Sequence, residues 1–162
     1  MSMRTRRSRE LGIKQHVDEM LAGSVPDNAL LAQLSKQCTD NPSQDNSFQY
    51  AFALSKSRHE GELAHAVAIL DSLVANGYEH QADCLYGSAV AYYLLGDFAR
   101  SRAIAEMILR SRGGRHDLAS QLHTASIVSK EQRDRKQAAA ALGGTVAVAA
   151  IGVACLLGGR KR

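Results

Sequence analysis

Tryptophan is absent from this 162-residue sequence, and proline occurs only twice. Both prolines, Pro26 and Pro42, lie in polar segments, where they interrupt no apolar run. Alternation of apolar and polar residues, which is typical of half-buried strands, is also missing. Because proline breaks helices and alternation marks strands, these absences predict an all-α fold.

Chemistry-bearing motifs are equally scarce. The three cysteines are far apart and form no C-x-x-C pair, so we expect neither a disulfide framework nor a zinc site. The six histidines do not pair with cysteines or carboxylates at metal-ligand spacing, and no P-loop, G-x-S-x-G or H-E-x-x-H motif occurs. We therefore predict a protein without catalysis or cofactor, and keep a membrane-bound enzyme as an alternative.

Positive charge gathers at the two ends of the chain. The net charge is +4, but of the 20 lysines and arginines, seven lie in residues 4–9 and 160–162. Residues 10–159 keep 13 basic groups against 16 acidic ones, which excludes a basic field for nucleic acid.

The start of the chain has no apolar h-region for a secretory signal. Since Glu10 soon follows its arginines, we expect residues 1–26 to form a flexible basic arm; the alternative is a mitochondrial presequence.

Residues 138–159 contain no charged side chain. A helix of that length spans about 33 Å, enough to cross a hydrocarbon core of about 30 Å. Basic residues flank it on both sides, as at the headgroup layers of a bilayer. We predict a tail anchor in the membrane, with the preceding domain in the cytosol; a buried core helix is the alternative. The anchor positions are Ala138, Leu142, Val146, Ile151, Leu156 and Gly159, and the targeting tail is Arg160, Lys161 and Arg162.

Helical periodicity fills the segment between the arm and the anchor, residues 27–137. Apolar residues of 63–74 recur at three- and four-residue steps, and Asn76-Gly77 ends that helix. Further helices are expected over 10–22, 27–38, 48–54, 80–95, 98–109 and 116–136. Asn46 or Ser47 is the expected N-cap of the 48–54 helix, Asp97 that of the 98–109 helix, and Gly113-Gly114 the end of the latter.

Residues 89–98 match the helix–turn–helix junction of a tetratricopeptide repeat. Small residues allow the helices to approach closely, an aromatic fills the gap, and Gly96-Asp97 forms the turn. A weaker copy lies upstream at a second-helix spacing of 35 residues. The packing positions are Ala51, Ala66, Ala89, Tyr92, Gly96 and Ser101. Two repeats need caps, which helices 27–38 and 116–136 would supply, so we predict a tetratricopeptide-like bundle of two degenerate repeats.

The first helices of such repeats line a concave groove that binds a helix or an extended peptide. In the predicted register, the groove positions are Phe48, Phe52, Ser55, Lys56, Tyr86, Val90, Tyr93 and Leu94. The alternative for each aromatic residue is an ordinary place in the core, covered by a capping helix.

Taken together, these features resemble the mitochondrial fission 1 family. The resemblance rests on residues 48–57, 66–70 and 85–93 and extends over 27–162. It implies a cytosol-facing adaptor on the mitochondrial outer membrane, and also on peroxisomes, that recruits a dynamin-like GTPase or its adaptors. It also implies an N-terminal arm able to occupy the groove. This chain departs from the family in its longer, more basic start and in Gly113-Gly114, where proline is usual.

The leading hypothesis is therefore a membrane-anchored, non-enzymatic adaptor of organelle fission that contacts the lipid bilayer and its protein partners but no nucleic acid. The alternative is a tail-anchored receptor for chaperones or imported precursor proteins. Such receptors carry a basic clamp, whereas the predicted groove holds only Lys56. Whether the protein forms a homo-oligomer is left open.

Overall fold

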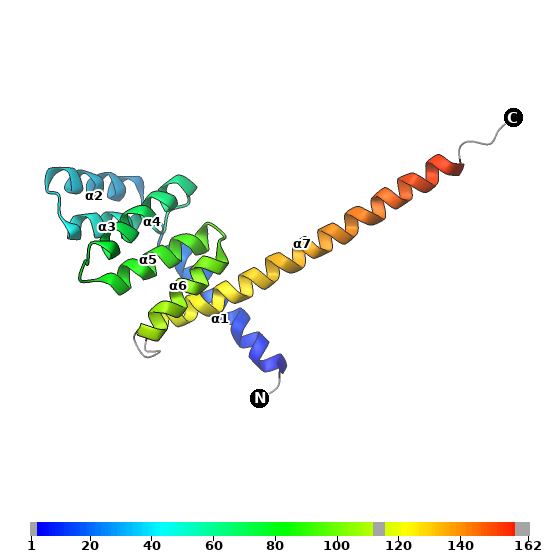
Figure 1. The fold of residues 1–162 in the computed structure, drawn as a ribbon, viewed down its shortest axis with the longest axis horizontal. Coiled ribbons are helices and arrows are strands. Elements are labelled where there is room, and N and C mark those ends of the chain that lie inside the picture. Colours follow the sequence, from blue (N-terminus) through cyan, green and yellow to red (C-terminus); the bar gives the residue numbers. More distant parts are fainter. Residues whose placement is uncertain (1–2, 112–115, 158–162) are drawn as a thin grey trace. The chain divides into compact units, whose positions relative to one another are not determined.

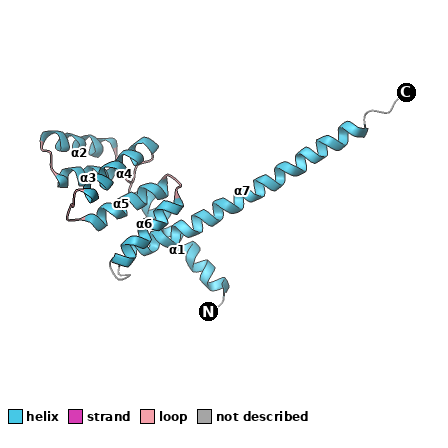
Figure 2. Ribbon diagram, in the orientation of Figure 1, coloured by secondary structure: helices cyan, strands magenta, loops and turns pink. Residues whose placement is uncertain are grey.

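The computed structural model describes residues 3–111 and 116–157, with side chains as far as residue 142. Those residues form helices and no strand (Figure 2), so the all-α prediction is confirmed. The chain divides into two units after Ser129, and the helical body described below belongs to the first. The helices are α1 (Met3–Gly23), α2 (Asn28–Asp40), α3 (Gln44–Leu54), α4 (Glu60–Ala75), α5 (Gln81–Leu94), α6 (Phe98–Ser111) and α7 (Asp117–Leu157) (Figure 1).

Two helix ends follow directly from local sequence. After α4 the chain turns at Gly77, with φ 73°, and after α5 it turns at Gly96, with φ 76°. Glycine adopts this left-handed conformation without steric cost. The carboxylate of Asp97 then accepts a hydrogen bond from the Arg100 amide at 3.1 Å and caps α6. The turns expected at these positions are confirmed.

The start of α3 differs from expectation, since neither Asn46 nor Ser47 is the N-cap. Ser43, with extended backbone after Pro42, caps the helix and accepts a hydrogen bond from the Asn46 amide at 3.1 Å. The Asn46 side chain instead donates to the Asn41 carbonyl at 2.7 Å. The helix therefore starts at Gln44, inside the segment expected to be a polar loop, because the first residue able to cap after the proline is Ser43.

The two expected helix pairs are α3–α4 and α5–α6, and the first helices of the two pairs, α3 and α5, also contact each other. Five of the expected packing positions lie at the centre of these contacts or at their turns: Ala51, Ala66, Ala89 and Ser101 are fully buried, and Gly96 forms the second turn. Tyr92 is only partly buried, against Leu63 and Val67 of α4. At Ser101, where alanine is usual, the hydroxyl lies 3.0 Å from the Ser126 hydroxyl of α7. The serine thus gains a partner that alanine would lack.

Close approach of α3 to α5 depends on Gly87. A Cβ atom there would lie 3.1 Å from Cδ2 of Phe52 and 2.9 Å from Cδ1 of Leu70. The missing side chain gives the Phe52 ring its place on the inner face of the repeats, although glycine lowers helix propensity by about 1 kcal/mol.

The flexible arm expected for residues 1–26 is replaced by helix α1 over Met3–Gly23. Val17 and Leu21 of this helix are 1% and 4% exposed. They join a core cluster with residues of α5, α6 and α7. The second half of α1 is therefore held by burial of apolar side chains, worth about 1.5–3 kcal/mol each.

Several expected features lie outside the described residues. These are the end of α6 at Gly113-Gly114, the tail 160–162, and the side chains of the expected anchor from residue 143 onward. In the part of the chain that the structure describes, no helix combines the length and the apolar character needed to span a bilayer.

Candidate partner-binding groove

The expected groove positions come together on the inner face of α3 and α5, but four of the eight are covered. Val90 is fully buried, and Tyr86 and Tyr93 are 7% and 6% exposed. Ser55 is also fully buried, and its hydroxyl donates to the Phe52 carbonyl at 2.8 Å. A partner cannot reach these four side chains while the chain keeps this conformation.

Helix α1 covers the groove together with α7, whose Ala119, Leu122 and Ala125 belong to the same buried cluster. Val17 and Leu21 belong to the same buried cluster as Tyr86, Val90 and Tyr93, and Met20 packs against it. The sequence carried a signal for this contact, since Val17, Met20 and Leu21 form the apolar side of a weakly amphipathic helix. The spacing alone gave no indication of where that side would pack, whereas the family resemblance implied an N-terminal arm able to occupy the groove.

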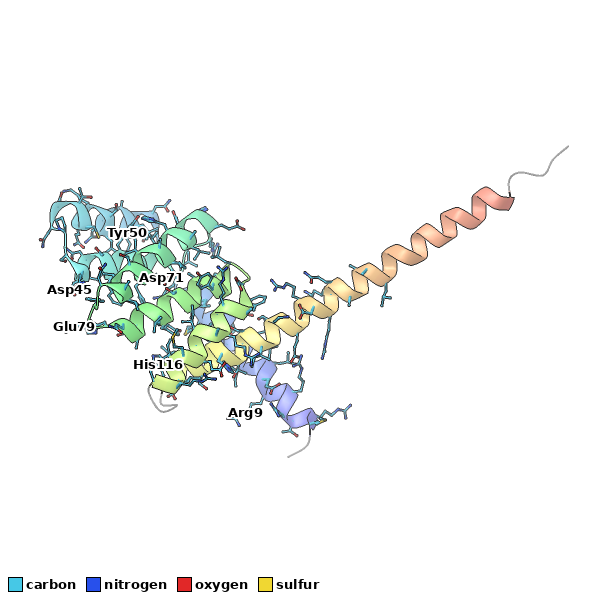
Figure 3. All side chains as sticks on the ribbon, in the orientation of Figure 1. Arg9, Asp45, Tyr50, Asp71, Glu79 and His116 are labelled. Atoms are coloured by element: carbon cyan, nitrogen blue, oxygen red, sulfur yellow. The ribbon has the colours of Figure 1, made fainter. Side chains whose placement is uncertain are left out.

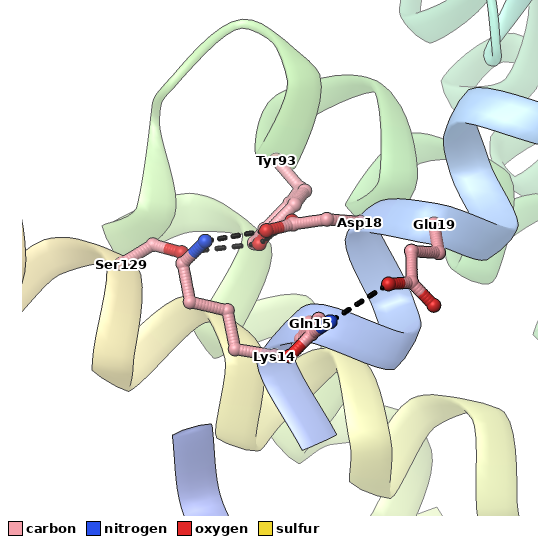
Figure 4. A network of polar contacts seen from close by, with 6 residues as sticks. All are labelled: Lys14, Gln15, Asp18, Glu19, Tyr93 and Ser129. Carbon is pink, nitrogen blue, oxygen red and sulfur yellow. Dashed lines mark hydrogen bonds and ion pairs between the residues drawn. The ribbon is translucent and has the colours of Figure 1, made fainter. Parts of the chain in front are cut away.

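A polar network fastens α1 beside these apolar contacts (Figure 4). The Tyr93 hydroxyl of α5 donates to Oδ1 of Asp18 at 2.6 Å and lies 3.0 Å from the Ser129 hydroxyl of α7. The other oxygen of Asp18 accepts from Nζ of Lys14. Burial and the neighbouring carboxylate raise the pKa of Tyr93 well above its usual range. The network joins three helices around one neutral phenol.

Replacing Tyr93 with phenylalanine should weaken the docking of α1 without removing the ring. The variant loses the hydrogen bond to Asp18, whose side chain is 43% exposed, so we expect a loss of only about 1 kcal/mol in the free energy that holds α1. Amide hydrogen exchange should show about fivefold lower protection over residues 13–23. Tyr92→Phe is the matched control, and equal losses in both variants would contradict the role of the network.

The same network predicts an alkaline transition. The pKa of Tyr93 is higher in the folded protein than in the unfolded chain, so the folded protein keeps the hydroxyl proton to a higher pH. The protonated hydroxyl therefore contributes fully to the free energy of unfolding below about pH 10, and this contribution is lost as pH rises beyond that value.

Two cavities remain open on the inner face, on either side of the covered centre. One, of about 440 Å³, lies where the end of α1 meets Lys56, Arg58 and Leu94. Leu94 is 38% exposed there and is the most exposed of the eight groove positions. The other, of about 560 Å³, is lined by Phe48 and Phe52. The open parts of the groove are thus its two ends.

Lys56 is half-buried, and its ammonium lies 4.1 Å from the centroid of the Phe52 ring. Burial lowers the pKa of this lysine. Attraction between a cation and an aromatic face offsets part of the loss of hydration. Within the described residues, no three histidine, cysteine or acidic side chains are grouped closely enough to hold a metal ion.

Comparison with known proteins bears on the resemblance and on the fold. No family model matches the sequence. The mitochondrial fission 1 protein of Mycosarcoma maydis is 26% identical over 110 residues, which cover 68% of this chain and 71% of that protein. The resemblance to mitochondrial fission 1 proteins is therefore confirmed at the level of sequence.

Solved structures give the same result for the fold. The crystal structure of the fission protein Fis1 from Saccharomyces cerevisiae has a TM-score of 0.64 at 16% identity, covering 72% of this chain and 95% of that one. Yeast Fis1 in complex with an Mdv1 fragment has a TM-score of 0.61 at 16% identity, covering 72% and 94%. The helical body thus has the fold of these proteins over nearly their whole length.

Proposed function

We propose that this protein is a non-enzymatic adaptor of mitochondrial fission. The observation that carries the proposal is the match over 110 residues to a mitochondrial fission 1 protein, which covers most of both chains. The shared fold supports it, since one of the similar structures is a complex with a fragment of another protein, Mdv1. The chain would act by holding a partner, and the partner would bring a dynamin-like GTPase to the membrane.

We further propose that residues 138–159 anchor the protein in the mitochondrial outer membrane and that peroxisomes are a second location. The support is the uncharged 22-residue run between basic flanks, with Arg160, Lys161 and Arg162 as the targeting tail. Residues 27–137 would then face the cytosol. An anchor of this kind raises the effective concentration of a weakly binding groove at the organelle surface.

The groove on α3 and α5 is the proposed partner site, with α1 as its cover. Val90 and Tyr93 are buried against α1, so a partner that contacts them must displace α1. Leu94 and the cavity beside Lys56 are accessible beforehand and would form the first contact. Charged substitutions at Val90 or Tyr93 would disturb folding, which makes Leu94 the better position for a test.

Expression in yeast cells that lack their own mitochondrial fission 1 protein tests the function. The wild-type chain should restore a divided mitochondrial network from the fused one. Leu94→Glu should reduce the rescue at least severalfold because a buried interface disfavours an unpaired charge. Leu118→Glu on α7 is the matched control, since Leu118 is 42% and Leu94 38% exposed.

Circular dichroism of both variants should show unchanged helix content. Absence of rescue by the wild-type chain at normal expression would contradict the fission function. Equal rescue by Leu94→Glu and Leu118→Glu would contradict the groove. If chaperones or precursor proteins, rather than fission proteins, co-purify with the wild-type chain, the protein would be a receptor for imported proteins.

A further inference from the structure

The open cavity of about 560 Å³ at the α3 end of the groove has its own chemistry. It lies between the first turns of α3 and α5 and the loop that joins α4 to α5. No residue of α1 lines it, so it is accessible while α1 covers the rest of the groove. Its volume falls within the range of about 300–1,000 Å³ that is usual for ligand pockets.

Aromatic rings form one wall of this cavity. The centroid of Phe48 lies 5.3 Å from that of Phe52, 5.6 Å from that of Tyr78 and 6.4 Å from that of His80. Tyr78 and His80 are themselves 5.4 Å apart. Tyr78 is only 4% exposed, whereas Phe48 and Phe52 are partly buried and can offer π-faces that attract a cation.

Carboxylates line the cavity together with these rings. Asp45, Glu79 and Asp83 all line it, and Asp45 and Glu79 lie at the same edge of the helical body (Figure 3). Asp45 is held in place by the Tyr78 hydroxyl, which donates to it at 2.8 Å. Among the described residues, no lysine or arginine lines the pocket. The imidazole of His80 lies 3.5 Å from a carboxylate oxygen of Glu79 and 3.8 Å from one of Asp83. Three carboxylates against one imidazole still leave the pocket an excess of negative charge beside its aromatic rings.

Tyr78 contacts one of these carboxylates. Burial, then the hydrogen bond to Asp45, raises the pKa of Tyr78 to about 12. The chain also shows a cation resting on one of these rings, since the Lys56 ammonium lies over Phe52. Phe52, one of the lining rings, thus already makes a cation–π contact within the chain.

We propose that this pocket binds a cationic side chain, an arginine, of the partner segment that lies along the groove. Arginine is favoured over lysine because its planar guanidinium stacks on aromatic rings while its N–H groups reach carboxylates, and because it is more weakly hydrated. The inference rests on the proposed function, since it names the chemistry by which the groove selects its partner.

The binding test uses the full-length protein in detergent micelles, labelled with ¹⁵N, and N-acetyl-arginine amide as the probe. N-acetyl-citrulline amide is the matched neutral probe, because it keeps the shape of arginine without its charge. Arginine should shift the amide signals of residues 78–83 in a saturable manner, with at least about fivefold higher affinity than citrulline. The absence of shifts, or equal affinity for both probes, would overturn the proposal.

Two variants locate the binding. Glu79→Gln with Asp83→Asn should lower arginine affinity about 10-fold, whereas Asp40→Asn with Glu106→Gln changes the net charge equally and should have little effect. Phe48→Leu keeps an apolar side chain without a ring and should lower the affinity about threefold. Equal losses in the two charge variants would show non-specific attraction and overturn the pocket.

These outcomes are independent of organelle division. If arginine binds but the yeast rescue fails, the arginine-binding pocket is supported and the proposed fission function is contradicted. If the rescue succeeds but arginine does not bind, the groove recognises its partner by other contacts and the pocket is overturned.

Discussion

A single arginine at the centre of the predicted anchor, Val148→Arg, is expected to move the protein from the membrane fraction into the supernatant almost completely. Residues 138–159 contain eight alanines and five glycines, so their insertion is only marginally favourable. A charge at the centre of a membrane helix costs about 2.5–3.5 kcal/mol, which such a segment cannot offset. Deletion of residues 138–162 should have the same result.

Carbonate extraction followed by sedimentation of isolated mitochondria measures this effect. Ala138→Arg is the matched control, because a long basic side chain at the end of the span can reach the headgroup layer. It should stay in the pellet with the wild-type protein. Retention of the 138–162 deletion in the pellet would show that the helical body itself holds the membrane and that the anchor proposal is wrong.

The second large effect is expected from Val17→Asp combined with Leu21→Asp, which should release α1 from the groove. These two side chains are almost fully buried against α5 and α7. Loss of their burial removes about 3 kcal/mol or more, and the unpaired carboxylates add to the cost of docking. Amide protection over residues 13–23 should fall by about 100-fold or more, while α4 and α5 stay protected.

Leu11→Asp on the same helix is the control, since Leu11 is 40% exposed and a charge there remains hydrated. The release should also strengthen partner binding, because the partner no longer has to displace α1. Unchanged protection of α1 would contradict the assignment of α1 as the groove cover. Simultaneous loss of protection in α4 and α5 would show instead that α1 is an inseparable part of the core.

Much of the fold could be predicted because its determinants are local. The periodic apolar residues of 63–74 predicted α4, and Gly77 and Gly96 predicted its end and the second repeat turn. Each of these features depends on residues within one or two helical turns. The start of α3 was predicted wrongly, because Ser43, directly after Pro42, caps the helix by accepting from the amide of Asn46.

The site was harder to predict because its parts are distant in the sequence. Phe48 and Phe52 were identified from the repeat register, but Tyr78 and His80, which complete the aromatic wall, lie in a loop without periodicity. Tyr93 was expected to face a partner, and in this structure it donates to Asp18, 75 residues away. Sequence spacing carries no information about such contacts between helices.

By itself, the sequence determined the helices, their turns, the repeat register and the resemblance to mitochondrial fission 1 proteins, because these depend on local backbone preference and on the spacing of residue types. Only the tertiary structure decided that α1 fills the centre of the groove and that an aromatic and acidic pocket stays open at its end. The reason is energetic: an apolar face is buried wherever packing is most favourable, and that place depends on the whole arrangement of helices rather than on any one segment.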